Sequence, residues 1–223
     1  MARLNAEQME NFNGGGTGGG FFSLKNDKDT ARVRFLFNGI DDVSNLGLSV
    51  HEVQVGDKKR AVNCLREYGG SIEDCPFCRA QMPIRAKYFI PLYNIEQDKV
   101  QIWERGKKFG NKLSSLCGRY QNLVSHVFEI ERNGMPGDQQ TTYEIYETGA
   151  DNTTLNDFEE VPDALGSVVL NKTFEDMQYF VDRGVFPDDM GNGNNSGIVR
   201  RGGDNRAERR TPSNPNGGRG ERF

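Results

Sequence analysis

The chain has 223 residues, a formal net charge of -4 and 35% hydrophobic residues, which suffices for one domain of ordinary size with tails. No apolar run approaches the ~18–20 residues of a membrane span, so we expect a soluble, cytoplasmic protein without membrane contact. Four cysteines in a chain of this length, without a secretory signal before them, argue against a small disulfide scaffold.

Charge is unevenly distributed along the chain. Residues 51–120 contain 13 Lys and Arg against 8 Asp and Glu, whereas residues 144–190 contain 2 against 12. Residues 191–223 contain 7 against 3. The basic middle of the chain is therefore where we expect an anionic partner to bind.

Composition also predicts the domain boundaries. Glycine fills most of residues 14–20, so residues 1–20 are expected to be a flexible N-terminal arm with a glycine linker. The packed domain is predicted over residues 21–150. Residues 151–190 are an acidic segment with a helix expected near its end, and residues 191–223 are predicted to be a disordered Arg/Gly-rich tail.

The first part of the packed domain predicts two strands. Residues 31–37 alternate between apolar and polar side chains, and residues 48–55 do so again before a basic turn. The cations of this part that we expect to contact an anionic partner are Arg32, Arg34, Lys58 and Lys59.

The most specific pattern is a set of four metal-ligand types, with twelve, ten and two residues between successive members: His51, Cys64, Cys75 and Cys78. Zinc takes thiolate and imidazole ligands in a tetrahedron, and a Cys-x-x-Cys turn lets two sulfurs face one ion. Proline at position 76 pre-sets that turn. Four protein ligands leave no open position, so the pattern predicts a structural Zn²⁺ in a subdomain at about residues 51–80.

Two other chemistries use similar cysteines. A thiol-disulfide oxidoreductase at Cys75/Cys78 is one alternative, but its dithiol turn should follow a buried strand. Here the preceding residues 69–74 are Gly-Gly-Ser-Ile-Glu-Asp. A zinc deaminase needs proline before the first cysteine of the pair, and this chain has Asp74. The pattern therefore favours zinc.

Residues 85–93 and 99–105 predict a β-hairpin with one apolar and one aromatic, cationic face. With a three-residue loop, Phe89 lies opposite Arg105, and Trp103 points outward. Aromatic rings among cations fit the stacking of unpaired bases, at ~1–3 kcal/mol per base. The alternative is that Trp103 and Tyr93 cover a second small core under the zinc loop or the C-terminal helix. The outward aromatic and cationic residues of this region are Arg85, Lys87, Phe89, Tyr93, Lys99, Trp103, Arg105 and Lys107.

The remaining elements complete a fold prediction. Residues 111–123 have the apolar spacing of a helix, with Cys117 on its buried face, and residues 126–130 and 141–147 predict two more strands. About five strands, with a helix after the third strand of a barrel, are typical of a mainly β OB-fold, here with an inserted zinc-binding loop.

These features resemble a phage-type zinc-containing single-stranded DNA-binding protein, the helix-destabilising class. The resemblance covers residues 21–150 and rests on the four ligands, on the strand pair at 87–92 and 99–103, and on Gly-Lys-Lys-Phe at 106–109. It implies an OB-fold whose cleft holds DNA beside the zinc subdomain. By position, the implied DNA contacts are Arg85, Lys87, Tyr88, Tyr93, Trp103, Lys107 and Lys108.

The chain departs from this family at both ends. Family proteins have a basic N-terminal arm and an acidic C-terminal tail, whereas here the arm contains Arg3 with Glu7 and Glu10, and the last segment is basic. The resemblance implies that replication or recombination proteins bind the acidic residues 144–190 or the C-terminal tail.

We therefore predict a non-enzymatic protein that coats and protects single-stranded DNA without sequence specificity during phage replication, recombination or repair. If the chain is phage-encoded, its compartment is the bacterial host cytoplasm. A zinc-stabilised protein-interaction adaptor is the alternative from another functional class.

Overall fold

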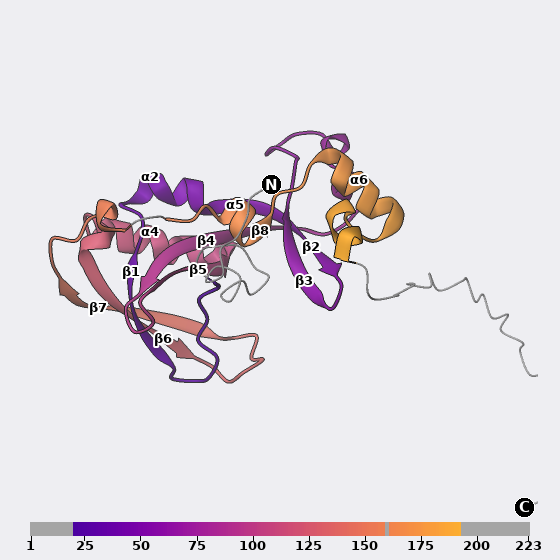
Figure 1. The fold of residues 1–223 in the computed structure, drawn as a ribbon. Helices are drawn as coiled ribbons and strands as arrows, with labels where there is room; N and C mark the ends of the chain where they lie inside the picture. The colour runs from indigo at the N-terminus through magenta and orange to yellow at the C-terminus, as the bar shows by residue number, and fades with distance from the viewer. Residues whose placement is uncertain (1–19, 159–160, 193–223) are drawn as a thin grey trace, which may run out of the picture. The chain divides into compact units, whose positions relative to one another are not determined.

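The computed structural model describes residues 20–158 and 161–192 (Figure 1). The predicted N-terminal arm lies outside the described residues except for Gly20, and the predicted C-terminal tail lies outside them except for residues 191–192. In the described ranges, no helix is both long enough and apolar enough to cross a membrane.

Eight strands form one open sheet in the described part of the chain. Along the sheet they follow the order β7-β6-β1-β4-β2-β3-β8, and β5 pairs with β4 outside this path. Every pair is antiparallel except β3 with β8. The strands are β1 Thr30–Phe35, β2 Gly47–Val55, β3 Lys58–Asn63, β4 Ile84–Asn94, β5 Lys99–Gly106, β6 His126–Asn133, β7 Thr142–Ala150 and β8 Val169–Leu170.

Helices are few and short. The α-helices are α2 Ile40–Val43, α3 Pro76–Arg79, α4 Gly110–Arg119, α5 Ala164–Ser167 and α6 Phe174–Arg183. The prediction of a mainly β protein with few helices is thus confirmed. The expected number of five strands is wrong, and no strand pairing within the described residues closes the sheet into a barrel.

The β4–β5 hairpin has a longer turn than the sequence analysis assumed. Asn94 pairs with Lys99, so residues 95–98 form the turn, and Asp98 in it has a φ of 50°. Phe89 consequently lies opposite Glu104, and Trp103 lies opposite Ile90. Because side chains alternate along a strand, a shift of one residue moves a side chain to the other face. The predicted outward position of Trp103 is therefore wrong.

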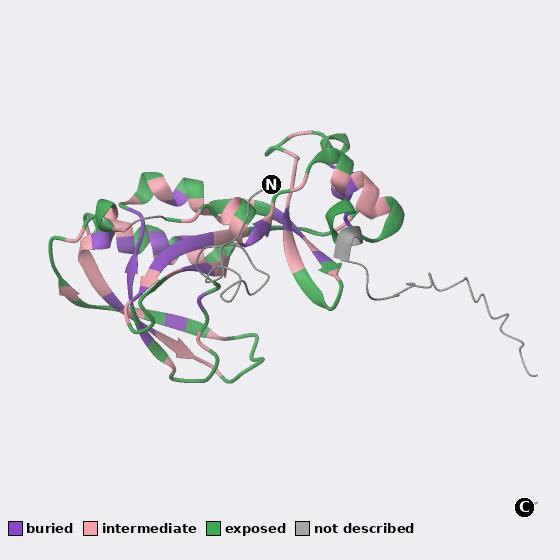
Figure 2. Cartoon of the chain, viewed as in Figure 1, coloured by how far each residue is buried: buried purple, intermediate pink, exposed green. Residues whose placement is uncertain are grey.

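The middle of this hairpin is buried, as the purple segments of β4 and β5 in Figure 2 show. On one face, Ile90 and Trp103 pack in a core that reaches Phe128 of β6 and Leu113 of α4. On the other face, a smaller core contains Phe89, which was expected at the surface. This core contains Val50, Phe89, Ile102, Val168 and Val169.

Residues after β7 supply the cover for that second face. Val168 and Val169 lie next to or within β8, which pairs with β3 at the edge of the sheet. Phe89 is 1% exposed beneath them and Trp103 is 0% exposed on the opposite face. The alternative reading of the sequence places Trp103 and Tyr93 over a second small core. In the structure Phe89 lies in the second core, and Trp103 lies in the first.

The helix predicted in the acidic segment is α6. Thr173 accepts a hydrogen bond from the backbone N–H of Asp176, whose side chain accepts from the backbone N–H of Thr173, so a capping box begins the helix. Gly184 ends it with a φ of 80°, a left-handed conformation that glycine adopts without strain. Met177 and Phe180 of α6 pack in a third core with Phe77 of α3.

Candidate metal centre

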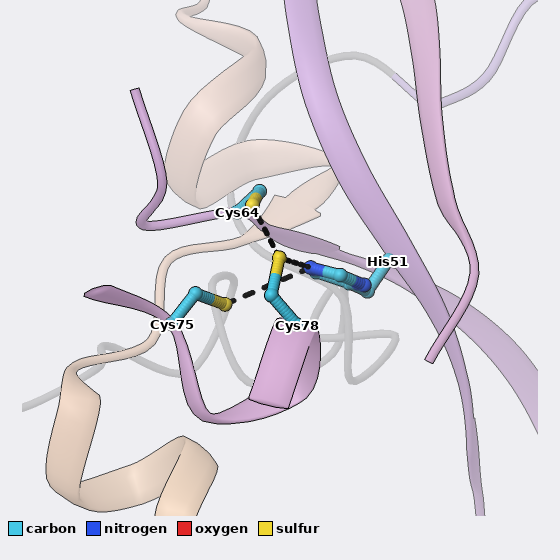
Figure 3. Close-up of side chains that lie close together, drawn as sticks. All are labelled: His51, Cys64, Cys75 and Cys78. Atoms are coloured by element: carbon cyan, nitrogen blue, oxygen red, sulfur yellow. Dashed lines mark hydrogen bonds between the residues drawn. The ribbon is translucent and has the colours of Figure 1, made fainter. Parts of the chain in front are cut away.

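Three separate segments bring four ligand side chains together (Figure 3). His51 lies in β2, and Cys64 directly follows β3, which pairs with β2. Cys75 is the N-cap residue of α3, and Cys78 lies within that helix. Antiparallel pairing of β2 and β3 therefore carries two ligands toward the short helix that carries the other two.

The distances among the ligand atoms fit one tetrahedral ion. Cys64 Sγ lies 3.6 Å from Cys78 Sγ, and His51 Nε2 lies 3.6 Å from the Sγ atoms of both Cys75 and Cys78. All four ligand atoms lie within 4.8 Å of one another. Zinc bonds of about 2.3 Å to sulfur and about 2.0 Å to nitrogen separate neighbouring ligands by about 3.5–3.8 Å. The cluster could thus hold a metal ion, and its dimensions are compatible with structural zinc.

The imidazole is oriented for coordination through Nε2. Its Nδ1 lies 3.2 Å from the carbonyl oxygen of Pro83, which fixes the ring and leaves Nε2 facing the sulfurs. Burial lowers the pKa of His51, because a charged ring is poorly solvated there. Burial thus favours the neutral imidazole that a metal requires, and the hydrogen bond to Pro83 acts in the opposite direction on the pKa.

The thiols experience two opposing effects. Burial raises the pKa of Cys64 to about 12. At Cys75 burial also disfavours the thiolate, but backbone N–H groups of Leu65, Cys78 and Phe77 donate to its sulfur and hold its pKa below the usual thiol value. Amide groups directed at one sulfur are what a metal-bound thiolate needs around it.

An apolar shell contributed by α6 surrounds the cluster. The Met177 sulfur lies 4.0 Å from the sulfur of Cys75, and the rings of Phe77 and Phe180 lie 5.7 Å apart. Phe186, just after α6, stacks on Phe180 at 4.5 Å. Cys75 is buried beneath this packing, and Cys64 and Cys78 are half-buried. Four candidate ligands from the protein suit a closed structural site rather than a catalytic one.

The residues that were expected to bind DNA divide into several groups. Three of the cations gather on one carboxylate, Glu52. Lys87 lies 2.5 Å and Lys59 2.6 Å from its oxygens, and Arg85 lies at 3.7 Å. Hydrogen bonds from Lys59 and Lys87 lower the pKa of Glu52 to about 2. Lys87 also contacts Glu104 at 2.6 Å.

Two arginines of β1 have structural partners. Arg34 is buried, forms an ion pair with Asp151 and donates to the carbonyl of Val124 at 3.1 Å. Arg32 is exposed and lies 3.1 Å from Glu96. The prediction that Arg34 reaches a ligand at the surface is therefore wrong, since its guanidinium joins β1 to the segment after β7.

The aromatic residues are not exposed as a row. Tyr88 packs against the first core. Its hydroxyl oxygen lies 2.6 Å from the position that a Cβ atom on Gly110 would occupy. Tyr93 donates to Asp98 at 2.5 Å and its ring contacts Phe158 at 5.2 Å. With Phe89 and Trp103 buried, the predicted aromatic surface of β4 and β5 does not form.

Arg105 is mostly enclosed as well. Its guanidinium lies 4.8 Å from the ring of Trp103 and 4.2 Å from the ring of Tyr143. Its Nε is buried without a hydrogen-bond partner among the described residues, and burial lowers its pKa. Lys58, Lys107 and Lys108 are exposed.

A cationic hollow of about 300 Å³ remains beside β5. Its lining contains Lys59, Arg60 and Lys87, and also Glu52 and Glu104, whose carboxylates pair with Lys59 and Lys87. The ring of Phe21 lines it as well and is 50% exposed. Sequence reasoning missed Phe21 and Arg60. Neighbouring side chains in an extended segment point to opposite sides, so one of Phe21 and Phe22 could be expected at the surface. The sequence does not show which one, because the segment pairs with Ile102, far along the chain. The backbone N–H of Phe22 donates to Ile102 at 2.9 Å, which places Phe21 at the edge of β5.

Comparison of the chain with protein-family models, curated proteins and solved structures gives no significant match. The function is therefore argued from the sites themselves.

Proposed function

We propose that this protein binds single-stranded DNA without sequence specificity, as a non-enzymatic coating protein with a structural zinc ion. The cationic hollow carries the proposal. Arg60 and the exposed Lys59 would contact phosphates, with Lys87 held between Glu52 and Glu104, and the exposed ring of Phe21 would stack on a base. Phe21 takes the role that the sequence analysis gave to Trp103.

The strand order supports an OB-type core within the larger sheet. In chain order β1, β4 and β5 precede α4, and β6 and β7 follow it, with β1 paired to both β4 and β6. An OB-fold likewise has its helix between the third and fourth of five strands. Between β5 and β7 the described residues have side-chain contacts in place of pairing, with Trp103 and Tyr143 at 5.2 Å. We propose a barrel left open at this junction.

Zinc would act on the DNA-binding residues through the β2–β3 hairpin. His51 and Cys64 hold the two strands of that hairpin from one end, and Lys59 and Arg60 lie on β3. Four ligands around Cys75 and Cys78 also favour a metal over a redox dithiol at that pair. The ion would supply folding energy rather than chemistry.

The test is fluorescence anisotropy with labelled oligo(dT) at several salt concentrations. Affinity should fall by ~0.7 log units per phosphate contact for each tenfold rise in salt. The double variant Lys59→Gln/Arg60→Gln should bind more weakly and with a shallower slope. Arg119→Gln, at the exposed end of α4, is the matched control and should bind as the wild type does.

Phe21→Ala should weaken binding by ~1–3 kcal/mol at every salt concentration, because stacking does not release counterions. Absence of binding to oligo(dT) at low salt, or binding without salt dependence, would contradict the proposed function. Capture of a partner protein without any binding of oligo(dT) would instead favour the adaptor.

A further inference from the structure

A second hollow adjoins the cationic one at the ring of Phe21. Its volume is about 510 Å³, and its walls come from residues 21–25, the start of β1 and the β4–β5 turn. Phe21 lines both hollows. Along β5, Gln101 lines the second hollow and Glu104 the first, on opposite faces of the strand. A polymer that crosses the edge of β5 would pass from one hollow to the other over Phe21.

One wall of the second hollow contains a chain of carboxamides. Asn94 is 3% exposed and Gln101 is 9% exposed. Asn94 Nδ2 donates to Gln101 Oε1 at 3.1 Å, and Gln101 Nε2 donates to Gln97 Oε1 at 3.2 Å. The backbone N–H of Gln97 donates to Asn94 Oδ1 at 3.2 Å. These bonds fix the direction in which each amide points.

The chain of carboxamides uses only part of its hydrogen-bonding capacity. Each carboxamide has two N–H donors and an oxygen with two lone pairs, and the bonds among these three residues occupy five of these twelve positions. A buried amide with spare donors gains from a polar partner, because burial without one is unfavourable. The hollow therefore offers preoriented donors and acceptors to a ligand.

The charges of the second hollow select against a phosphate. Its lining contains one cation, Lys25, and one anion, Glu96, and the carboxylate of Glu96 is engaged by Arg32. In the first hollow, three cations stand against two carboxylates. The second hollow thus suits a neutral, planar group with polar edges beside an aromatic ring.

We infer that the second hollow binds a nucleobase of the DNA strand, with its face on Phe21 and its edge hydrogen-bonded to Gln97 and Gln101. This inference rests on the proposed function, because the base reaches the hollow as part of a strand whose phosphates lie in the first one. Every base has hydrogen-bond donors and acceptors on its edge, so the site would favour a polar base over an apolar one without selecting a particular base.

The experiment compares oligo(dT) with an oligomer of the same length in which difluorotoluene replaces thymine. Difluorotoluene has the shape of thymine but is a poor hydrogen-bonding partner. The wild type should bind oligo(dT) about two- to tenfold more tightly, as expected for one or two neutral hydrogen bonds. Gln97→Met, at an exposed position, should lose this difference and keep its affinity for the difluorotoluene oligomer.

Two further variants separate a binding role from a role in holding the turn. Gln101→Met should also lose the difference, and Gln54→Met on β2, which does not line either hollow, should keep it. Equal affinity of the wild type for both oligomers would overturn the inference, as would a difference that survives Gln97→Met and Gln101→Met. In both cases the proposed function stands. Absence of binding to either oligomer overturns the proposed function itself.

Discussion

The metal-ligand region and the β4–β5 hairpin differ in what positions their side chains. In the ligand region, four residues from three segments bring their ligand atoms within 4.8 Å of one another, as a single metal ion would require. In the hairpin, a turn over residues 95–98 sets the register, and the register decides which face each ring takes. Ligand chemistry tolerates variation in the connecting loops, whereas strand register changes completely with one residue. The first region was therefore predictable and the second was not.

The largest effect is expected when one of the four candidate ligands is replaced. Cys78→Ser should abolish stoichiometric zinc binding and unfold the region of β2, β3 and α3, since coupled metal binding contributes on the order of 10 kcal/mol. Zinc content after dialysis and thermal unfolding measure this. Cys117→Ser, on α4 away from the cluster, should retain both zinc and stability. Unchanged zinc content in Cys78→Ser would show that the cluster does not hold the ion.

The hairpin core should respond next most strongly. Trp103→Ala should lower the free energy of unfolding by about 3–5 kcal/mol, because the indole is fully buried against Phe22, Phe109 and Tyr143. Urea unfolding measures the loss. Phe21→Ala, at an exposed ring, should leave the stability nearly unchanged. A stable Trp103→Ala variant with weaker DNA binding would return to Trp103 the stacking role that we propose for Phe21.

The shell of α6 should have an intermediate effect that is specific to the metal region. Met177→Ala should cost about 2–4 kcal/mol and expose the sulfur of Cys75, with which Met177 is in contact. Release of zinc to a chelator should become faster. Val185→Ala changes an exposed apolar residue near the same helix and should release zinc at the wild-type rate. Equal rates in both variants would mean that the helix does not protect the ion.

The smallest effect is expected at Arg34. Arg34→Gln removes the ion pair with Asp151 and part of the contact with the carbonyl of Val124, which should cost about 1–3 kcal/mol of stability. Binding of oligo(dT) should not change, because this guanidinium faces the protein. Anisotropy and urea unfolding test the two halves of this prediction. A loss of affinity without a loss of stability would return Arg34 to the DNA-binding set.

The sequence by itself determined the candidate ligand set, the mainly β class and the helix near the end of the acidic segment, because each depends on local chemistry: thiol spacing, polarity alternation, helical apolar spacing and a terminal glycine. Only the tertiary structure decided which aromatic ring is exposed. Phe89 is covered by Val168 and Val169, distant residues that join the sheet through β8, and Phe21 reaches the surface because its segment pairs with β5. Burial depends on what packs on a face, and alternation along one strand does not contain that information.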